Sequence, residues 1–226
     1  MEELKTSMSE LWNLLTDEEQ VLLAEHVSLQ QFNDNDTIYE SGDEATFLPY
    51  LLEGGVKILG KGVARQQQIV RMVQPNAFFG LRPTFIDEPH HYTAIAMQSS
   101  SVLMLPLQLI HQLIMNNHRV ALFFIQNLSD MLERSTETVI TLSQKHMRGR
   151  LADMLLMVKS KYGTEADGQT LRIRLSRAEW ANISNMTISN AIRTLSAFSS
   201  EGILALQGRR ISILKEEELM QIAKRG

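Results

Sequence analysis

The pattern of apolar and polar positions divides the chain into three stretches with different periods. Up to about residue 27, apolar residues recur at helical spacing, and Thr16-Asp17-Glu18-Glu19 has the form of a helix-capping box. Between Phe32 and Pro106, short apolar runs alternate with turn residues at intervals of roughly 8–12 residues, which is typical of an antiparallel barrel or sandwich. From about Leu107 the helical period returns.

The longest helical pattern extends from about His118 to Met147 without proline or glycine. Such a helix would be about 40 Å long, more than a small barrel can bury. One seam along it has alternating spacings of four and three residues, which predicts a partner helix, most simply that of a second subunit. Packing against the chain's own barrel is the alternative. The seam consists of Phe124, Leu128, Met131, Ser135, Thr138 and Leu142.

The pattern beyond a predicted break at Gly149 indicates a second, smaller domain. Ser176-Arg177-Ala178-Glu179 has the form of a capping box, and Thr187 can cap a further helix that ends near Ser200. A three-residue turn separates these two helices, and a hairpin follows, so the segment predicts a winged helix-turn-helix. The other predicted elements are a helix at 151–161, strands at 171–175, 203–206 and 211–214, and a last helix from residue 215.

Composition and charge narrow the function. The chain contains no cysteine, which excludes disulfides, thiol catalysis and cysteine-held iron–sulfur clusters. Residues 1–144 carry 8 basic and 18 acidic residues, a balance of −10, whereas residues 145–226 carry 14 and 8, a balance of +6. This asymmetry predicts that the second part binds a polyanion, although an uneven solvated surface is the alternative.

Other classes of protein lack support in the sequence. The acidic, amphipathic start and the absence of a long apolar run predict a soluble cytoplasmic protein that does not contact a membrane. Nucleophile-elbow, phosphate-loop and dinucleotide-binding motifs are missing, as is the histidine spacing of a cupin metal site, so we do not expect an enzyme.

The order of these segments resembles the CRP/FNR family of bacterial transcription regulators, and so does the local motif LSRAEWANISNMTISNAIRTL at residues 175–195. The resemblance covers nearly the whole chain, including the Gly149-Arg150 pair. It implies an α+β fold with an N-terminal cyclic-nucleotide-binding-like antiparallel β-barrel (jelly roll), a long dimerisation helix and a C-terminal winged helix-turn-helix. It divides the chain into an effector-binding domain at 1–117, the dimerisation helix and hinge at 118–147, and a DNA-binding domain at 148–226.

Carried over residue by residue, the resemblance places the recognition helix at Ile188 to Ser200. Arg193 would read guanine, because a guanidinium can bond guanine O6 and N7 together. Ser189 replaces a glutamate found in most of the family, and Ile188 replaces an arginine of the cyclic-AMP receptor protein, so we expect a half-site that differs in part. Isoleucine favours a thymine methyl and serine is permissive. Phosphate contacts and the wing tip would come from Ser176, Arg177, Thr187, Asn190, Arg209 and Arg210.

The resemblance also implies an effector pocket in the barrel, but the ribose-binding glutamate and phosphate-binding arginine of the family are replaced by Leu81 and His91. Cyclic AMP is therefore not expected. Three alternatives for the effector stay open: an unidentified small molecule, haem, or no ligand at all. The candidate pocket residues are Gly80, Leu81, Arg82, His91, Tyr92, Ser135 and Thr136, and the candidate haem ligands are His90, His91, His111 and His118.

The sequence thus predicts a homodimeric regulator that binds an inverted repeat in double-stranded DNA, with RNA polymerase as a further partner and an effector other than cyclic AMP. The alternative is a haem- or nucleotide-sensing regulatory module that acts through a protein partner. DNA binding that falls steeply with salt would distinguish the two.

Overall fold

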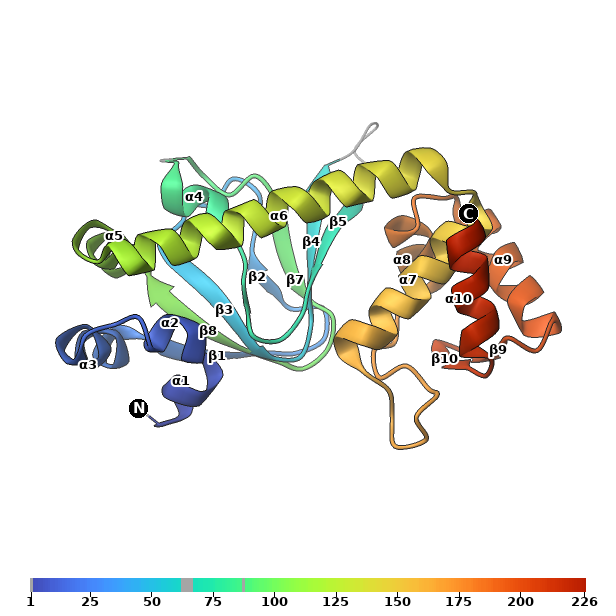
Figure 1. Cartoon of the computed structure of the whole chain (residues 1–226), viewed down its shortest axis with the longest axis horizontal. Coiled ribbons are helices and arrows are strands. Elements are labelled where there is room, and N and C mark those ends of the chain that lie inside the picture. Colours follow the sequence, from blue (N-terminus) through green and yellow to red (C-terminus); the bar gives the residue numbers. More distant parts are fainter. Residues whose placement is uncertain (1, 62–66, 87) are drawn as a thin grey trace. The chain divides into compact units, whose positions relative to one another are not determined.

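The computed structural model describes residues 2–61, 67–86 and 88–226 (Figure 1). The chain forms two compact units, Met1–Glu133 and Arg134–Gly226, and the boundary falls inside the long helix α6 (His118–Gln144). The side chain of Leu142, a predicted seam residue, lies outside the described part. Within the described ranges, no helix is long and apolar enough to cross a membrane.

The first unit begins with three helices, α1 (Glu2–Ser7), α2 (Ser9–Trp12) and α3 (Asp17–His26). The predicted capping box at the start of α3 is confirmed: Glu19 N–H donates to Thr16 Oγ1 at 3.3 Å, and Thr16 N–H donates to the Glu19 carboxylate at 2.9 Å. Leu11 and Trp12 of α2 are buried in the core beside the barrel.

Two four-stranded antiparallel sheets follow, in the orders β1-β8-β3-β6 and β2-β7-β4-β5. They confirm the predicted antiparallel barrel. Alternating side chains from both sheets, among them Leu51, Val56 and Val102, are buried in one cluster with Phe79, which follows β6. The strands are β1 (Ser28–Phe32), β2 (Thr37–Tyr39), β3 (Phe47–Glu53), β4 (Val56–Lys61), β5 (Gln67–Val73), β6 (Ala77–Phe78), β7 (Thr93–Ala96) and β8 (Ser100–Pro106).

Helices α4 (Leu81–Phe85) and α5 (Leu107–Asn116) complete the barrel, and α6 packs on it. The predicted orientation of α6 is wrong. Phe124 is fully buried in the barrel core, and Leu128 and Met131 pack against the same core, so this part of the seam faces the chain's own barrel.

A different stripe of α6 is exposed. Its apolar members are Leu122, Ile125, Leu132 and Val139, which are between 54% and 70% exposed. With Ser129, Thr136 and Ser143 between them, they repeat at alternating spacings of three and four residues. Each residue of the exposed stripe thus lies about one position from a residue of the predicted seam. The reason is that the barrel covers the side of α6 on which we expected a partner helix.

The second unit holds the predicted helix-turn-helix and wing. The helical conformation is interrupted at Lys145 and His146, just before α7. The predicted break at Gly149 is not found, since Gly149 is buried in the first turn of α7. A Cβ at Gly149 would lie 2.4 Å from the carbonyl carbon of Gly226. The elements are α7 (Met147–Tyr162), α8 (Arg177–Ile183), α9 (Ile188–Ser200), β9 (Leu204–Gln207), β10 (Arg210–Ile213) and α10 (Glu216–Arg225).

The strand predicted at 171–175 forms only isolated bridges, between Thr164 and Leu171 and between Thr170 and Ser212. Leu171, Ile173 and Leu175 are nevertheless buried, with exposed residues between them. The alternating pattern therefore predicted the buried side chains correctly. The hydrogen-bond ladder of a strand, however, does not form here.

Candidate nucleic-acid interface

Side-chain caps define both helices of the helix-turn-helix. Glu179 N–H donates to Ser176 Oγ at 3.2 Å, and Ser176 N–H donates to the Glu179 carboxylate at 2.8 Å, which confirms the predicted capping box. Asn190 N–H donates to Thr187 Oγ1 at 3.3 Å at the start of α9. Each capping hydroxyl accepts in these bonds and keeps its own O–H to donate, as a phosphate contact requires.

Helix α9 has one buried and one exposed face. Ala191, Leu195 and Phe198 are fully buried against the rest of the unit. Three of the predicted DNA-contacting residues lie on the exposed face, and so does Ile192, which the sequence reasoning missed. The signal that could have found Ile192 is its position one helical turn after Ile188. The exposed side chains are Ile188, Ser189, Ile192, Arg193, Ser196 and Ser200.

The structure brings two of the predicted residues together on this face. Arg193 Nη2 donates to Asn190 Oδ1 at 2.9 Å, one helical turn away. Asn190 therefore restrains the guanidinium that we expect to read guanine. The two roles of Asn190 use different atoms. Its Oδ1 accepts from Arg193, and its two amide N–H donors can serve the predicted phosphate contact.

Arg150 connects three carbonyl groups around the turn of the helix-turn-helix. Its Nε donates to the Ser184 carbonyl at 3.0 Å, its Nη2 to the Asn185 carbonyl at 3.0 Å, and its Nη1 to the Lys145 carbonyl at 3.2 Å. Asn185 has a φ of 48°, in the left-handed region that asparagine tolerates better than most residues. The turn between α8 and α9 is thus fixed to the start of α7.

The wing is attached to α8 through Arg177, whose Nη2 donates to the Gly208 carbonyl at 3.0 Å. Gly208 has a φ of 59°, as the tight hairpin turn requires. Of the two arginines predicted at the wing tip, Arg209 is exposed, whereas Arg210 is in an ion pair with Glu165 at 2.5 Å. Glu165 also lies 3.6 Å from Arg174.

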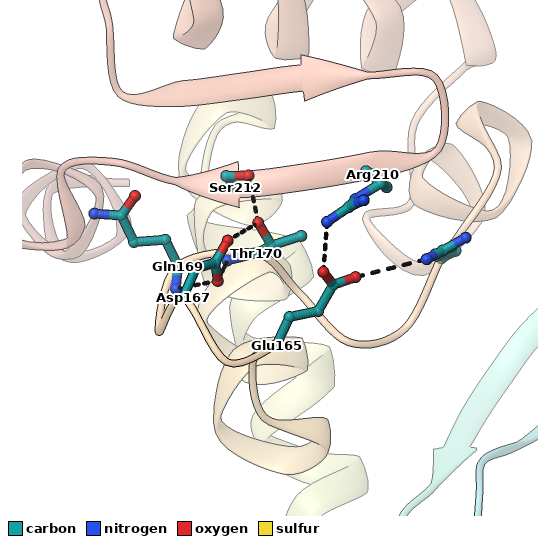
Figure 2. Close-up of polar contacts among 7 residues, drawn as sticks. Glu165, Asp167, Gln169, Thr170, Arg210 and Ser212 are labelled. Atoms are coloured by element: carbon teal, nitrogen blue, oxygen red, sulfur yellow. Dashed lines mark hydrogen bonds and ion pairs between the residues drawn. The ribbon is translucent and has the colours of Figure 1, made fainter.

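Figure 2 shows how the loop before α8 braces the wing from its outer edge. The Asp167 carboxylate accepts hydrogen bonds from the Gln169 N–H, the Thr170 N–H and the Thr170 hydroxyl, at 2.5–3.0 Å. These bonds, with that from the Thr170 side chain first, lower the pKa of Asp167 to about 2. Thr170 Oγ1 lies 2.8 Å from Ser212 Oγ on β10. The sequence reasoning missed this brace, because its partners are far apart in the chain.

In the first unit, the residues predicted for an effector pocket are used in other contacts. Leu81 is 3% exposed and belongs to the apolar core. Arg82 and His91 both contact the Glu88 carboxylate, at 2.6 and 3.0 Å, and all three side chains are exposed. The hydrogen bond from Arg82, followed by its charge, lowers the pKa of Glu88. Tyr92 is 46% exposed.

Aromatic side chains fill the space beside Gly80. The ring of His90 stacks on Tyr39 with 3.8 Å between centroids, and Tyr39 also stacks on Phe79. A Cβ at Gly80, which has a φ of 70°, would lie 3.3 Å from both His90 Cε1 and Tyr39 Oη. Burial lowers the pKa of His90, which favours its neutral ring.

The remaining predicted ligands are dispersed. His111 Nε2 lies 2.5 Å from the Thr84 carbonyl, and His118 is exposed at the start of α6. Among the described residues, no group of three or more His, Asp or Glu side chains could hold a metal ion. Ser135 and Thr136 are exposed on α6 and belong to the second unit, whereas the other candidate pocket residues belong to the first.

The two units carry opposite charge. The first has 7 basic and 17 acidic residues, a balance of −10, and the second has 15 and 9, a balance of +6. The exposed face of α9, the two caps and the wing all belong to the positive unit, which matches the negative charge of a phosphate backbone.

Comparisons with known proteins agree with this architecture. The model of the cyclic nucleotide-binding domain matches residues 29–117, and that of the Crp-like helix-turn-helix domain matches residues 149–222. The chain is 25% identical over 190 residues to the global nitrogen regulator of Nostoc sp., which covers 83% of this chain and 85% of that protein.

Two solved structures share the fold. A CRP-family transcriptional regulator of Thermus thermophilus is 26% identical with a TM-score of 0.74, over 86% of this chain and 96% of that one. FixK2 of Bradyrhizobium japonicum is 20% identical with a TM-score of 0.76, over 87% and 96% of the two chains. With both domain models matched in this order, the chain belongs to the CRP/FNR family of transcription regulators.

Proposed function

We propose that the protein is a homodimer that binds an inverted-repeat operator and reads it with α9. The observation that carries this proposal is the exposed face of α9, where Arg193, Ile188 and Ser189 lie beside capping hydroxyls that can donate to phosphate. The net charge of +6 on this unit supports DNA as the partner. RNA polymerase is a further partner, expected from the family resemblance.

The exposed stripe on α6 supports the homodimer. Leu122, Ile125, Leu132 and Val139 repeat with the spacing of a coiled-coil seam, and a two-fold copy of the same helix would bury them. Two recognition helices related by that axis would enter successive major grooves about 34 Å apart. The operator should therefore consist of two inverted half-sites.

The contacts of the first unit support an effector other than cyclic AMP. Leu81 offers no acceptor for a ribose hydroxyl, and the Glu88 carboxylate already contacts both Arg82 and His91. Stacked Tyr39 and His90 occupy the space beside Gly80. Haem binding through His90 or His91 would require that histidine to leave its present partner, whereas His118 is exposed at the start of α6.

Selection of duplex DNA from a random library, at two salt concentrations and with and without a small-molecule extract, tests the proposal. We expect an enriched inverted repeat and affinity that falls steeply with salt. Arg193→Ala should lose about 1–3 kcal/mol of discrimination at one guanine. Arg172→Ala, which removes another exposed arginine of the same unit, should leave discrimination unchanged.

Two results would contradict the proposal. The first is a selection that enriches no inverted repeat under either condition, which would favour a module acting through a protein partner. The second is full discrimination between operator and scrambled DNA by Arg193→Ala, which would remove α9 as the reading element.

A further inference from the structure

Two isoleucines are exposed on a helix face that is otherwise polar. Ile188 is 51% exposed and Ile192 is 45% exposed, and they lie one helical turn apart on α9. Their neighbours on that face are Ser189, Arg193 and Ser196. Single exposed apolar residues are common on protein surfaces, but two on the face that carries the proposed base-reading arginine indicate an apolar group on the partner.

The chemistry of the major groove identifies that group. Base edges there present hydrogen-bond donors and acceptors, and the one apolar group among them is the C5-methyl of thymine. Isoleucine neither donates nor accepts, so it cannot distinguish bases by hydrogen bonding. An isoleucine at the base edges therefore favours thymine and leaves a donor or acceptor unpaired opposite other bases.

The spacing of the two side chains fits base pairs about two steps apart. Four residues advance about 6 Å along a helix axis. Successive nucleotides of a strand are about 3.4 Å apart along the duplex, so the two side chains span about two base-pair steps. Arg193 follows Ile192 directly, and Asn190 holds its guanidinium on this same face.

We infer that Ile188 and Ile192 form a methyl-reading pair, which requires thymine at two positions of each operator half-site, beside the guanine read by Arg193. The inference rests on the proposed function. It adds Ile192 as a specificity-determining residue, and it assigns the chemical group in DNA that this apolar face recognises.

Parallel selections from two random duplex libraries test the inference, one containing thymine and the other containing uracil, which lacks only the methyl group. We expect an inverted repeat with fixed thymines from the first library, and loss of preference at those positions in the second. The same motif from both libraries would overturn the methyl-reading pair and leave the proposed function intact. No motif from either library would overturn both.

Binding to the selected operator then measures each contact. Replacing one contacted thymine by uracil should weaken binding by the wild-type protein about fourfold for each methyl. Ile192→Ala and Ile188→Ala should each bind the thymine and uracil forms of their own position equally. Alanine is a better helix former than isoleucine, so the variants should fold.

Leu214→Ala is the matched control, because Leu214 is 45% exposed in the same unit but lies outside α9. This variant should keep the full difference between thymine and uracil. If the two isoleucine variants keep that difference as well, the methyl-reading pair is overturned.

Discussion

The Arg150 guanidinium caps the carbonyl end of α8, because its Nη2 donates to Asn185 and its Nε to Ser184, both at 3.0 Å. These carbonyls follow the last turn of α8, where helix geometry leaves acceptors without partners in the helix itself. The bond from Nη1 to the Lys145 carbonyl joins the same side chain to the segment before α7. A single side chain thus fixes the position from which α9 starts.

Replacing Arg150 by lysine should lower the free energy of unfolding of the second unit by about 1.5–3 kcal/mol, because one ammonium cannot serve three separated carbonyls. Operator affinity should fall as well, since the turn before α9 is loosened. Denaturant titration and operator binding measure the two effects. Arg172→Lys, which alters an exposed arginine bonded to the Thr164 carbonyl, is the control; equal effects of both variants would contradict this role.

A double-mutant cycle at Asn190 and Arg193 should reveal coupling between the two side chains. Asn190→Ala releases the guanidinium in the free protein, so guanine discrimination should fall, but less than in Arg193→Ala. We expect a coupling energy of about 0.5–1.5 kcal/mol in operator binding. Strictly additive effects would show that Asn190 acts independently of Arg193.

Leu132→Glu should dissociate the proposed homodimer, because Leu132 is 70% exposed in the middle of the α6 stripe and would be buried against the partner helix. Losing two such side chains and opposing two carboxylates should raise the dimer dissociation constant by roughly a hundredfold or more. Analytical ultracentrifugation measures this constant. Gln126→Glu adds the same charge at an exposed position off the stripe and should leave the dimer intact.

Restoring the nucleotide-binding glutamate and arginine of the family should affect the stability of the first unit unequally. Leu81→Glu places an unpaired carboxylate in the apolar core and should destabilise the first unit by about 3–5 kcal/mol. His91→Arg alters an exposed side chain and should change stability by no more than about 0.5 kcal/mol. Thermal unfolding with and without cyclic AMP compares them; stabilisation of His91→Arg by cyclic AMP would contradict our account of the barrel.

Asp167→Asn should destabilise the wing brace near pH 7 but not in acid. The folded pKa of Asp167 is about 2, below its ordinary value of 3.8, so the ionised carboxylate stabilises the fold above that ordinary value. This contribution is lost as the pH falls from about 4 to 2. The difference in unfolding temperature between wild type and Asp167→Asn should shrink over that pH range. As a control, Glu217→Gln should unfold at the same temperature as wild type near neutral pH.

The features predicted correctly from the sequence are those that depend on residues close together along the chain. The caps at Thr16, Ser176 and Thr187 depend on residues three positions away, and alternation identified the buried side chains at 171–175 even where no ladder forms. The outward side of α6 was predicted wrongly, since periodicity identifies an apolar stripe without identifying what covers it.

The loop brace was missed for a different physical reason. Glu165 pairs with Arg210 across 45 positions, and Thr170 reaches Ser212 across 42. No local pattern encodes such polar contacts, because they depend on how the loop and the hairpin meet in space. Ile192 was overlooked because an isoleucine within a helix resembles a core residue until its exposure is known.

The opposite charges of the two units have a consequence for the kinetics of association. A polyanion repels the unit with a balance of −10 and attracts the unit with +6. Encounters that begin at the second unit would therefore be favoured over those that begin at the first, before any base is touched. Salt would then slow productive collisions by screening this preference as well as by weakening the final contacts.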